Sequence, residues 1–173
     1  MDSALIGRAD DIRAGCAAFG IALPAQVAYV LATVRHETAG QFRPIKEFGT
    51  GKYFEARYGG RKDLGNVHSG DGALFCGRGY VQITGRRNYR VFGHLLGLPL
   101  EAQPDLALDH ETALRILVIG FRDGLFTGRK LSDYVSGTRR DFVGARRCIN
   151  GQDRARLIAG YAEGYLRELG GDS

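Results

Sequence analysis

Residues 24–47 read PAQVAYVLATVRHETAGQFRPIKE, and this stretch decides the fold because it predicts one long buried helix. Pro24 suits the first position of a helix, and residues 25–34 are nearly all apolar. A helix that is apolar on every side belongs in the middle of a core, and Gly40 is available to end it. The sequence therefore predicts a central helix followed by a short segment that leads to Glu47.

Two carboxyl groups lie at the end of this helix, Glu37 in its last turn and Glu47 ten residues later. Burial and the negative end of the helix dipole both disfavour a charged Glu37, which is what a general acid needs near neutral pH. Hydrolysis of a glycosidic bond uses such a pair, one carboxyl group protonated and the other ionised. Glu37 and Glu47 are therefore a candidate acid and base.

The rest of the chain is mostly helical in its pattern. The spacing of apolar residues predicts helices over 3–18, 86–96, 111–121, 131–135, 141–148 and 153–169. Asp109 is the expected N-cap of a helix that carries a second His-Glu-Thr at 110–112, so Glu111 is interpreted as structural. Strand alternation is limited to residues 80–83, and no repeat or linker divides the chain. We predict a mainly α fold, with residues 1–173 forming a single domain.

Residues 48–80 differ from the rest because they are rich in glycine and show no helical period. Long segments of this kind are usually functional or disordered. Rings beside glycine turns can form the wall of a sugar-binding groove, and six aromatic residues are scattered here: Phe48, Tyr53, Phe54, Tyr58, Phe75 and Tyr80. The segment is therefore predicted to be a functional loop.

Residues 77–89 read GRGYVQITGRRNY and form a second stretch with chemical content. Its glycines let a ligand approach the backbone, while Gln82, Thr84 and Asn88 offer neutral donors and acceptors for hydroxyl and acetamido groups. The structural alternative is a loop followed by a helix with Thr84 as its N-cap, and both roles can hold at once. A phosphate-binding loop is disfavoured, because the pattern G-x-x-x-x-G-K-[ST] is absent.

Metal and disulfide chemistry find little support. The zinc-protease motif H-E-x-x-H needs a second histidine where this chain has Gly40. Cys16, Cys76 and Cys148 are widely spaced and are interpreted as small buried thiols. We predict no metal and no cofactor.

The chain carries a net charge of +5 with a pI near 9.3, and much of the excess lies between residues 139 and 156. A basic surface attracts polyanions such as a cell wall, anionic lipid or nucleic acid. The alternative is a solvated helix surface. Contact with an anionic cell wall or membrane is predicted for four arginines: Arg139, Arg140, Arg146 and Arg147.

Taken together, His36-Glu37-Thr38, the 77–89 stretch and Ile149-Asn150-Gly151 resemble the family 19 glycoside hydrolases, a chitinase-like group that includes bacteriophage and prophage endolysins. The resemblance runs from about residue 24 to residue 161. It implies a lysozyme-like, two-lobed helical fold with a substrate cleft, and an inverting mechanism. Glu37 matches the general acid, and Thr84 matches the hydroxyl residue that holds the nucleophilic water.

The resemblance also implies the remaining site residues. Glu47 is the choice for the general base, and Glu55 is the alternative. Substrate-groove positions are implied for five residues: His36, Tyr80, Gln82, Asn88 and Asn150.

The form of the chain resembles the endolysin branch, so we expect a peptidoglycan glycosidase that cleaves β-1,4 bonds between amino sugars during bacterial lysis. The alternative is a chitinase acting on N-acetylglucosamine polymers. A rival from another class is a non-catalytic wall-binding or nucleic-acid-binding domain. Acidic residues stand where a secretory signal would be basic, so we expect the protein to stay in the host cytoplasm until a holin opens the membrane. We also expect a monomer without an obligatory protein partner.

Overall fold

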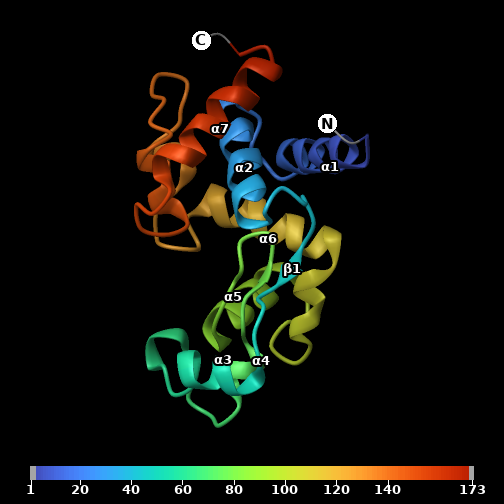
Figure 1. Cartoon of the computed structure of the whole chain (residues 1–173), viewed down its shortest axis with the longest axis vertical. Helices are drawn as coiled ribbons and strands as arrows, with labels where there is room; N and C mark the ends of the chain where they lie inside the picture. Colours follow the sequence, from blue (N-terminus) through green and yellow to red (C-terminus); the bar gives the residue numbers. More distant parts are fainter. Residues whose placement is uncertain (1–2, 172–173) are drawn as a thin grey trace. The chain divides into compact units, whose positions relative to one another are not determined.

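A computed structural model describes the backbone of residues 3–171 and the side chains of residues 8–171. The predicted mainly α fold is confirmed (Figure 1). The elements in chain order are α1 (Ser3–Ala18), α2 (Pro24–Glu37), β1 (Ile45–Lys46), α3 (Gly51–Tyr58), η1 (Lys62–Leu64), α4 (Asp71–Leu74), β2 (Arg78–Gly79), α5 (Arg86–Leu96), η2 (Pro104–Leu108), α6 (His110–Asp123), η3 (Leu131–Asp133), η4 (Gly144–Cys148) and α7 (Ala155–Glu168). Elements marked η are short 3₁₀ helices.

The described chain forms two compact units, and the division falls within α6. Unit 1 contains residues 3–42 and 117–171. Its central helix α2 is buried from Val27 to Val34 and packs against α7 (Figure 1). The ring of Tyr29 lies 6.0 Å from Phe121 edge-on and 6.0 Å from Phe142 in a stacked arrangement. The predicted central helix is thus confirmed, with Pro24 in its first turn.

Unit 2 contains Arg43–Ile116. Strands β1 and β2 pair in antiparallel register, Ile45 opposite Gly79 and Lys46 opposite Arg78. Helices α3 and α4 pack together beside this ribbon, over a small core that includes Phe54, Tyr58 and Cys76. The ribbon therefore brings residues 45–47 next to the 77–83 segment, although 30 residues separate Glu47 from Gly77.

The prediction of an irregular loop over residues 48–80 is wrong, because helix α3 forms inside it. Thr50 caps this helix by accepting a hydrogen bond from the Tyr53 amide at 3.2 Å. Phe54 and Tyr58 are four residues apart, so both rings face the small core. Four of the six scattered aromatics are core residues, whereas Phe48 is fully exposed and Tyr53 is 45% exposed. The glycines lie at or near the helix ends, which hides the short helical pattern.

Three other local predictions also need correction. The strand is β2, and residues 80–83 form a turn closed by a bridge between Arg78 and Ile83. Residues 131–135 and 141–148 contain 3₁₀ turns and no α-helix. Helix α5 has Gly85 as its N-cap in place of Thr84, and its first amide, that of Arg86, donates to the Asn66 side chain at 2.8 Å. The predicted Asp109 cap is confirmed, since the Thr112 amide donates to its carboxylate at 3.1 Å.

Within residues 3–171, no helix combines the length and apolar character needed to cross a bilayer.

Candidate functional site

Glu37 is the last residue of α2, and the backbone that follows it is closely held. The Gly40 amide donates to the Arg35 carbonyl at 2.7 Å, and the Ala39 amide donates to the His36 carbonyl at 3.3 Å. These bonds form a Schellman termination, in which the left-handed position is Ala39 with φ of 49°. The buried Thr38 hydroxyl donates to the Val34 carbonyl at 2.7 Å and accepts from the Phe42 amide at 3.0 Å. The backbone of Glu37 is therefore fixed on both sides.

The carboxylate of Glu37 pairs with Arg146, which lies 109 residues away in sequence. Nη1 of Arg146 donates to Glu37 Oε1 at 2.6 Å, and Nε of Arg146 donates to the Asp153 carbonyl at 3.1 Å. The Arg146 side chain is only 4% exposed and that of Glu37 is 20% exposed. The predicted apolar setting of Glu37 is therefore incomplete, because a buried guanidinium contacts it.

The same contact corrects the predicted arginine surface. Arg146 is buried and cannot contact a cell wall, whereas Arg139, Arg140 and Arg147 are exposed. Arg139 pairs with Asp141 at 3.1 Å and donates to the Asp133 carbonyl at 2.8 Å. The adjacent residues Arg146 and Arg147 thus differ in burial, because Arg146 lies on the inward side of the η4 turn and Arg147 lies on the outward side.

Glu47 follows β1 and is held through both carboxylate oxygens. The Tyr58 hydroxyl donates to Oε1 at 2.9 Å, and the Gly77 amide donates to Oε2 at 3.1 Å. The Glu47 amide donates back to the Gly77 carbonyl at 2.8 Å. A Cβ at position 77 would lie 3.2 Å from Glu47 Oε2 and 2.8 Å from Gln82 Oε1, so this close approach requires glycine.

Gln82, Thr84 and Asn88 are half-buried and bond to the backbone around Gly77. The Gln82 side-chain amide, in a residue with φ of 56°, donates to the Ile45 carbonyl at 2.8 Å and to the Gly79 carbonyl at 3.0 Å. The Thr84 hydroxyl donates to the Gln82 carbonyl at 2.9 Å, and the Asn88 amide donates to the Thr84 carbonyl at 2.7 Å. In unit 2, Gln82, Thr84 and Asn88 are thus fixed by side-chain bonds to the backbone, and Glu47 is fixed separately by Tyr58 and Gly77.

The other predicted substrate residues have different positions. Tyr80 is 1% exposed, with its hydroxyl 3.0 Å from His110 Nδ1, so the prediction that its side chain contacts substrate is wrong. His36 is half-buried at the end of α2. Asn150 is exposed, follows the η4 turn, and accepts from the Gly151 amide at 2.8 Å. His36 and Asn150 belong with Glu37 to unit 1.

Glu55, the alternative base, has a structural position on α3. Its Oε1 accepts from the Gly70 amide at 3.1 Å, and its Oε2 accepts from the Ala73 amide at 3.4 Å. A Cβ at Gly72 would come within 2.7 Å of Glu55 Oε2. The carboxylate thus holds the first turn of α4 against α3.

Buried arginines hold the framework around Gly77. Arg78 is 3% exposed and donates to the Asp105 carboxylate at 2.7 Å and to the Tyr89 hydroxyl at 3.0 Å. It also donates to the carbonyls of Leu74 at 3.0 Å and Cys76 at 3.1 Å. These contacts join the segment before Gly77 to α5 and η2. Its backbone is therefore set by side chains from elsewhere in unit 2.

A second network joins α4 to α5. The buried Asp71 carboxylate accepts from Arg86 at 2.5 and 3.1 Å and from the amides of Val67 and His68 at 3.0 Å each. These hydrogen bonds, chiefly those from Arg86, lower the pKa of Asp71 from 3.8 to about 2. Arg86 also donates to Glu101 at 2.8 Å, and the bonds from Arg90 and Arg86 lower the pKa of Glu101 from 4.5 to about 2. The start of α5, next to Thr84, is thereby fixed to α4.

Within the described residues, His, Cys, Asp and Glu side chains form no group of three that could hold a metal ion. Cys16, Cys76 and Cys148 are buried free thiols, and burial raises the pKa of all three. Their interpretation as small core residues is confirmed.

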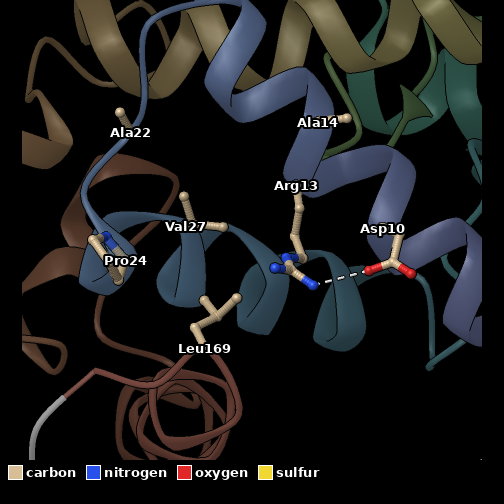
Figure 2. Close-up of a pocket in the computed structure, with 7 residues that line it drawn as sticks. All are labelled: Asp10, Arg13, Ala14, Ala22, Pro24, Val27 and Leu169. Carbon is tan, nitrogen blue, oxygen red and sulfur yellow. Dashed lines mark hydrogen bonds and ion pairs between the residues drawn. The ribbon is translucent and has the colours of Figure 1, made fainter.

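A hollow of about 510 Å³ lies in unit 1. Figure 2 shows residues that line it, including Asp10 and Arg13, which form an ion pair at 3.0 Å. The hollow is lined by Asp10, Arg13, Ala14, Ala22, Pro24, Val27 and Leu169. None of the predicted site residues lines this hollow.

Sequence reasoning missed Arg146 and Tyr58, the side chains that contact the two candidate carboxylates. In the sequence Arg146 resembles its charged neighbours, and the signal of a buried turn is the pair Ala145 and Cys148 beside it. The spacing of Phe54 and Tyr58 was the available signal for a packed helix.

The sequence matches no model of a known protein family. Among solved structures, the fold is similar to that of chitinase C from Streptomyces griseus HUT6037, with 21% identity over 95% of this chain and 84% of that chain and a TM-score of 0.66. A structure of a chitinase C mutant has 24% identity, coverage of 96% and 84%, and a TM-score of 0.64. A bacterial family 19 chitinase, described as different from the plant enzymes, has 19% identity, coverage of 98% and 87%, and a TM-score of 0.61. At these identities the likeness establishes the fold, which is the lysozyme-like helical fold that the sequence predicted.

Proposed function

We propose that the chain is a glycoside hydrolase in which Glu37 is the general acid and Glu47 is the general base. The observation that carries this proposal is the difference between the two carboxylates. Glu47 accepts one hydrogen bond on each oxygen from neutral donors, which fix the carboxylate and leave each oxygen a lone pair for a water hydrogen. Glu37 is bonded through Oε1 to Arg146, so Oε2 would carry the proton for the leaving group.

Thr84 would hold the water that attacks the sugar. Its hydroxyl hydrogen is directed to the Gln82 carbonyl, so its oxygen is oriented to accept a hydrogen bond from a water molecule. Glu47 would then remove a proton from this water while Glu37 protonates the glycosidic oxygen. Attack by water on the face opposite the leaving group inverts the anomeric centre.

For the substrate, we favour peptidoglycan over chitin. Exposed basic residues are close in sequence to both candidate carboxylates, with Arg35 two residues before Glu37 and Lys46 one residue before Glu47. Peptidoglycan carries carboxylates on its lactyl-peptide branches, whereas acetylated chitin is neutral, and a basic surface attracts the charged polymer. The exposed arginines Arg139, Arg140 and Arg147 add to this attraction. We infer a bacteriolytic role of the endolysin kind on this basis.

A chitinase is the second candidate, and the observation in its favour is that the similar solved structures are chitinases. Digestion of purified sacculi and of chitooligosaccharides side by side separates the two. We expect new reducing amino sugars from sacculi, detected by mass spectrometry after reduction. Cleavage of chitooligosaccharides alone would identify a chitinase.

The control is Glu37→Gln, which should lower the rate by about 10² to 10⁴-fold while the circular dichroism spectrum is unchanged. A parent protein that binds sacculi but cleaves neither substrate would point to the rival wall-binding domain. Near-normal turnover by folded Glu37→Gln would remove Glu37 from the mechanism.

A further inference from the structure

The candidate base has a neighbour that sequence patterns did not single out, the hydroxyl of Tyr58. Oε1 of Glu47 accepts from this hydroxyl at 2.9 Å, and Oε2 accepts from the Gly77 amide at 3.1 Å. One hydrogen bond on each oxygen fixes the plane of the carboxylate. Each oxygen keeps a second lone pair that can accept a proton or a water hydrogen.

Tyr58 is itself held in place from several sides. Its ring stacks on Phe54 at 6.4 Å with the planes 12° apart, and the Arg57 guanidinium lies 5.4 Å from the ring centre. Its carbonyl accepts from the Asn66 side chain at 2.9 Å. Burial, and next the hydrogen bond to Glu47, raise the pKa of Tyr58 above its ordinary value of 10.0. The hydroxyl therefore keeps its proton throughout the neutral range.

We infer that Tyr58 is a positioning residue that orients the Glu47 carboxylate as the base for the attacking water. This inference rests on the proposed glycosidase function. It also separates the two candidate bases, because Glu55 on the same helix directs its oxygens to the Gly70 and Ala73 amides. Glu47, which follows β1, is thus held by a side-chain donor. Glu55 is held by backbone amides and joins α3 to α4.

Other charged or titratable groups lie near Glu47 in sequence or in unit 2. From α3 they are Tyr58 and, over its ring, Arg57. The segment before β2 contributes the Cys76 thiol, whose pKa is raised by burial, with a further small increase from Glu47. From β1 itself, Lys46 lies 3.9 Å from Asp105. Tyr58 is the member of this set that donates directly to the Glu47 carboxylate.

Tyr58→Phe tests the inference because it removes the hydroxyl and keeps the ring. We expect kcat to fall about 10- to 100-fold with KM nearly unchanged, since a hydrogen bond to a charged group is lost in the reacting state. The matched control is Tyr53→Phe on the same helix, whose hydroxyl accepts from Arg57 at 2.9 Å, and it should leave both values unchanged.

A second readout needs no hydrolysis. The Tyr58 signal in ¹³Cζ-tyrosine NMR, assigned by its loss in Tyr58→Phe, should titrate at lower pH in Glu47→Gln than in the parent. Glu55→Gln should leave it in place. A Tyr58 signal that Glu47→Gln does not move would overturn the inference, as would an unchanged kcat in folded Tyr58→Phe. If the parent cleaves neither sacculi nor chitooligosaccharides, the proposed function fails while the titration still decides whether Tyr58 is coupled to Glu47.

Discussion

Replacing Arg146 with methionine should destabilise unit 1, and the structure sets the size of the effect. Arg146→Met keeps an apolar stem but removes the 2.6 Å ion pair with Glu37 and the 3.1 Å bond to the Asp153 carbonyl. Removing one partner of a buried ion pair costs about 3 to 5 kcal/mol, because the other charge is left buried and uncompensated. Glu37 retains 20% exposure, so we expect the lower end, about 3 kcal/mol.

For a chain of this length, a loss of about 3 kcal/mol corresponds to a fall in Tm of about 6 to 12 °C. The measurement is thermal unfolding by circular dichroism at pH 7. Arg147→Met is the matched control, because Arg147 is the adjacent exposed arginine, and its free energy of unfolding should change by less than about 0.5 kcal/mol.

A double-mutant cycle identifies the cause. If the ion pair is responsible, Arg146→Met combined with Glu37→Gln should be less destabilising than the sum of the two single changes, by at least about 1 kcal/mol. Equal Tm values for Arg146→Met and Arg147→Met would refute the reasoning. Arg146 would then behave as an exposed arginine, as the sequence predicted.

Four further outcomes are expected. Glu47→Gln should abolish hydrolysis, whereas Glu55→Gln should lower Tm through the loss of its bonds to α4 and leave kcat largely intact, as paired assays of activity and unfolding will show. Thr84→Val should depress kcat much more than it raises KM, and a change in Tm alone would make Thr84 purely structural. NMR of the first-formed product from a β-linked substrate should show the α anomer, so initial release of the β anomer would exclude inversion. Asp71 has a pKa of about 2 in the folded state against an ordinary value of 3.8, so the stability that its ionised form contributes is present above pH 4 and is lost as pH falls toward 2. Urea midpoints measured across that range should fall in the parent, and they should fall less steeply in Arg86→Gln.

The sequence was sufficient for the long elements of the fold. Helices α2 and α6 carry strong apolar patterns with Pro24 and Asp109 at their starts, and α5 was predicted with its observed bounds. Such helices are predictable because the signal repeats over several turns. Helix α3 has only eight residues with glycines at both ends, so packing of Phe54 and Tyr58 stabilises it more than propensity does.

The candidate site was predictable in part for a related reason. Glu37, Glu47 and Thr84 belong to local motifs, so the sequence alone can propose them as site residues. Their partners could not be identified by local rules, because Arg146 contacts Glu37 across 109 residues and Gly77 contacts Glu47 across 30. The burial of Tyr80 was equally hidden, since its hydroxyl neighbour His110 comes from another element.

The two candidate carboxylates are thus held by different kinds of donor, a charged guanidinium on Glu37 and two neutral groups on Glu47. The guanidinium bonded to Glu37 Oε1 fixes the direction of this carboxylate, and Oε2 is the oxygen that would reach the leaving group. Two neutral donors on Glu47 fix both oxygens without neutralising the carboxylate, so it can still accept a proton from water.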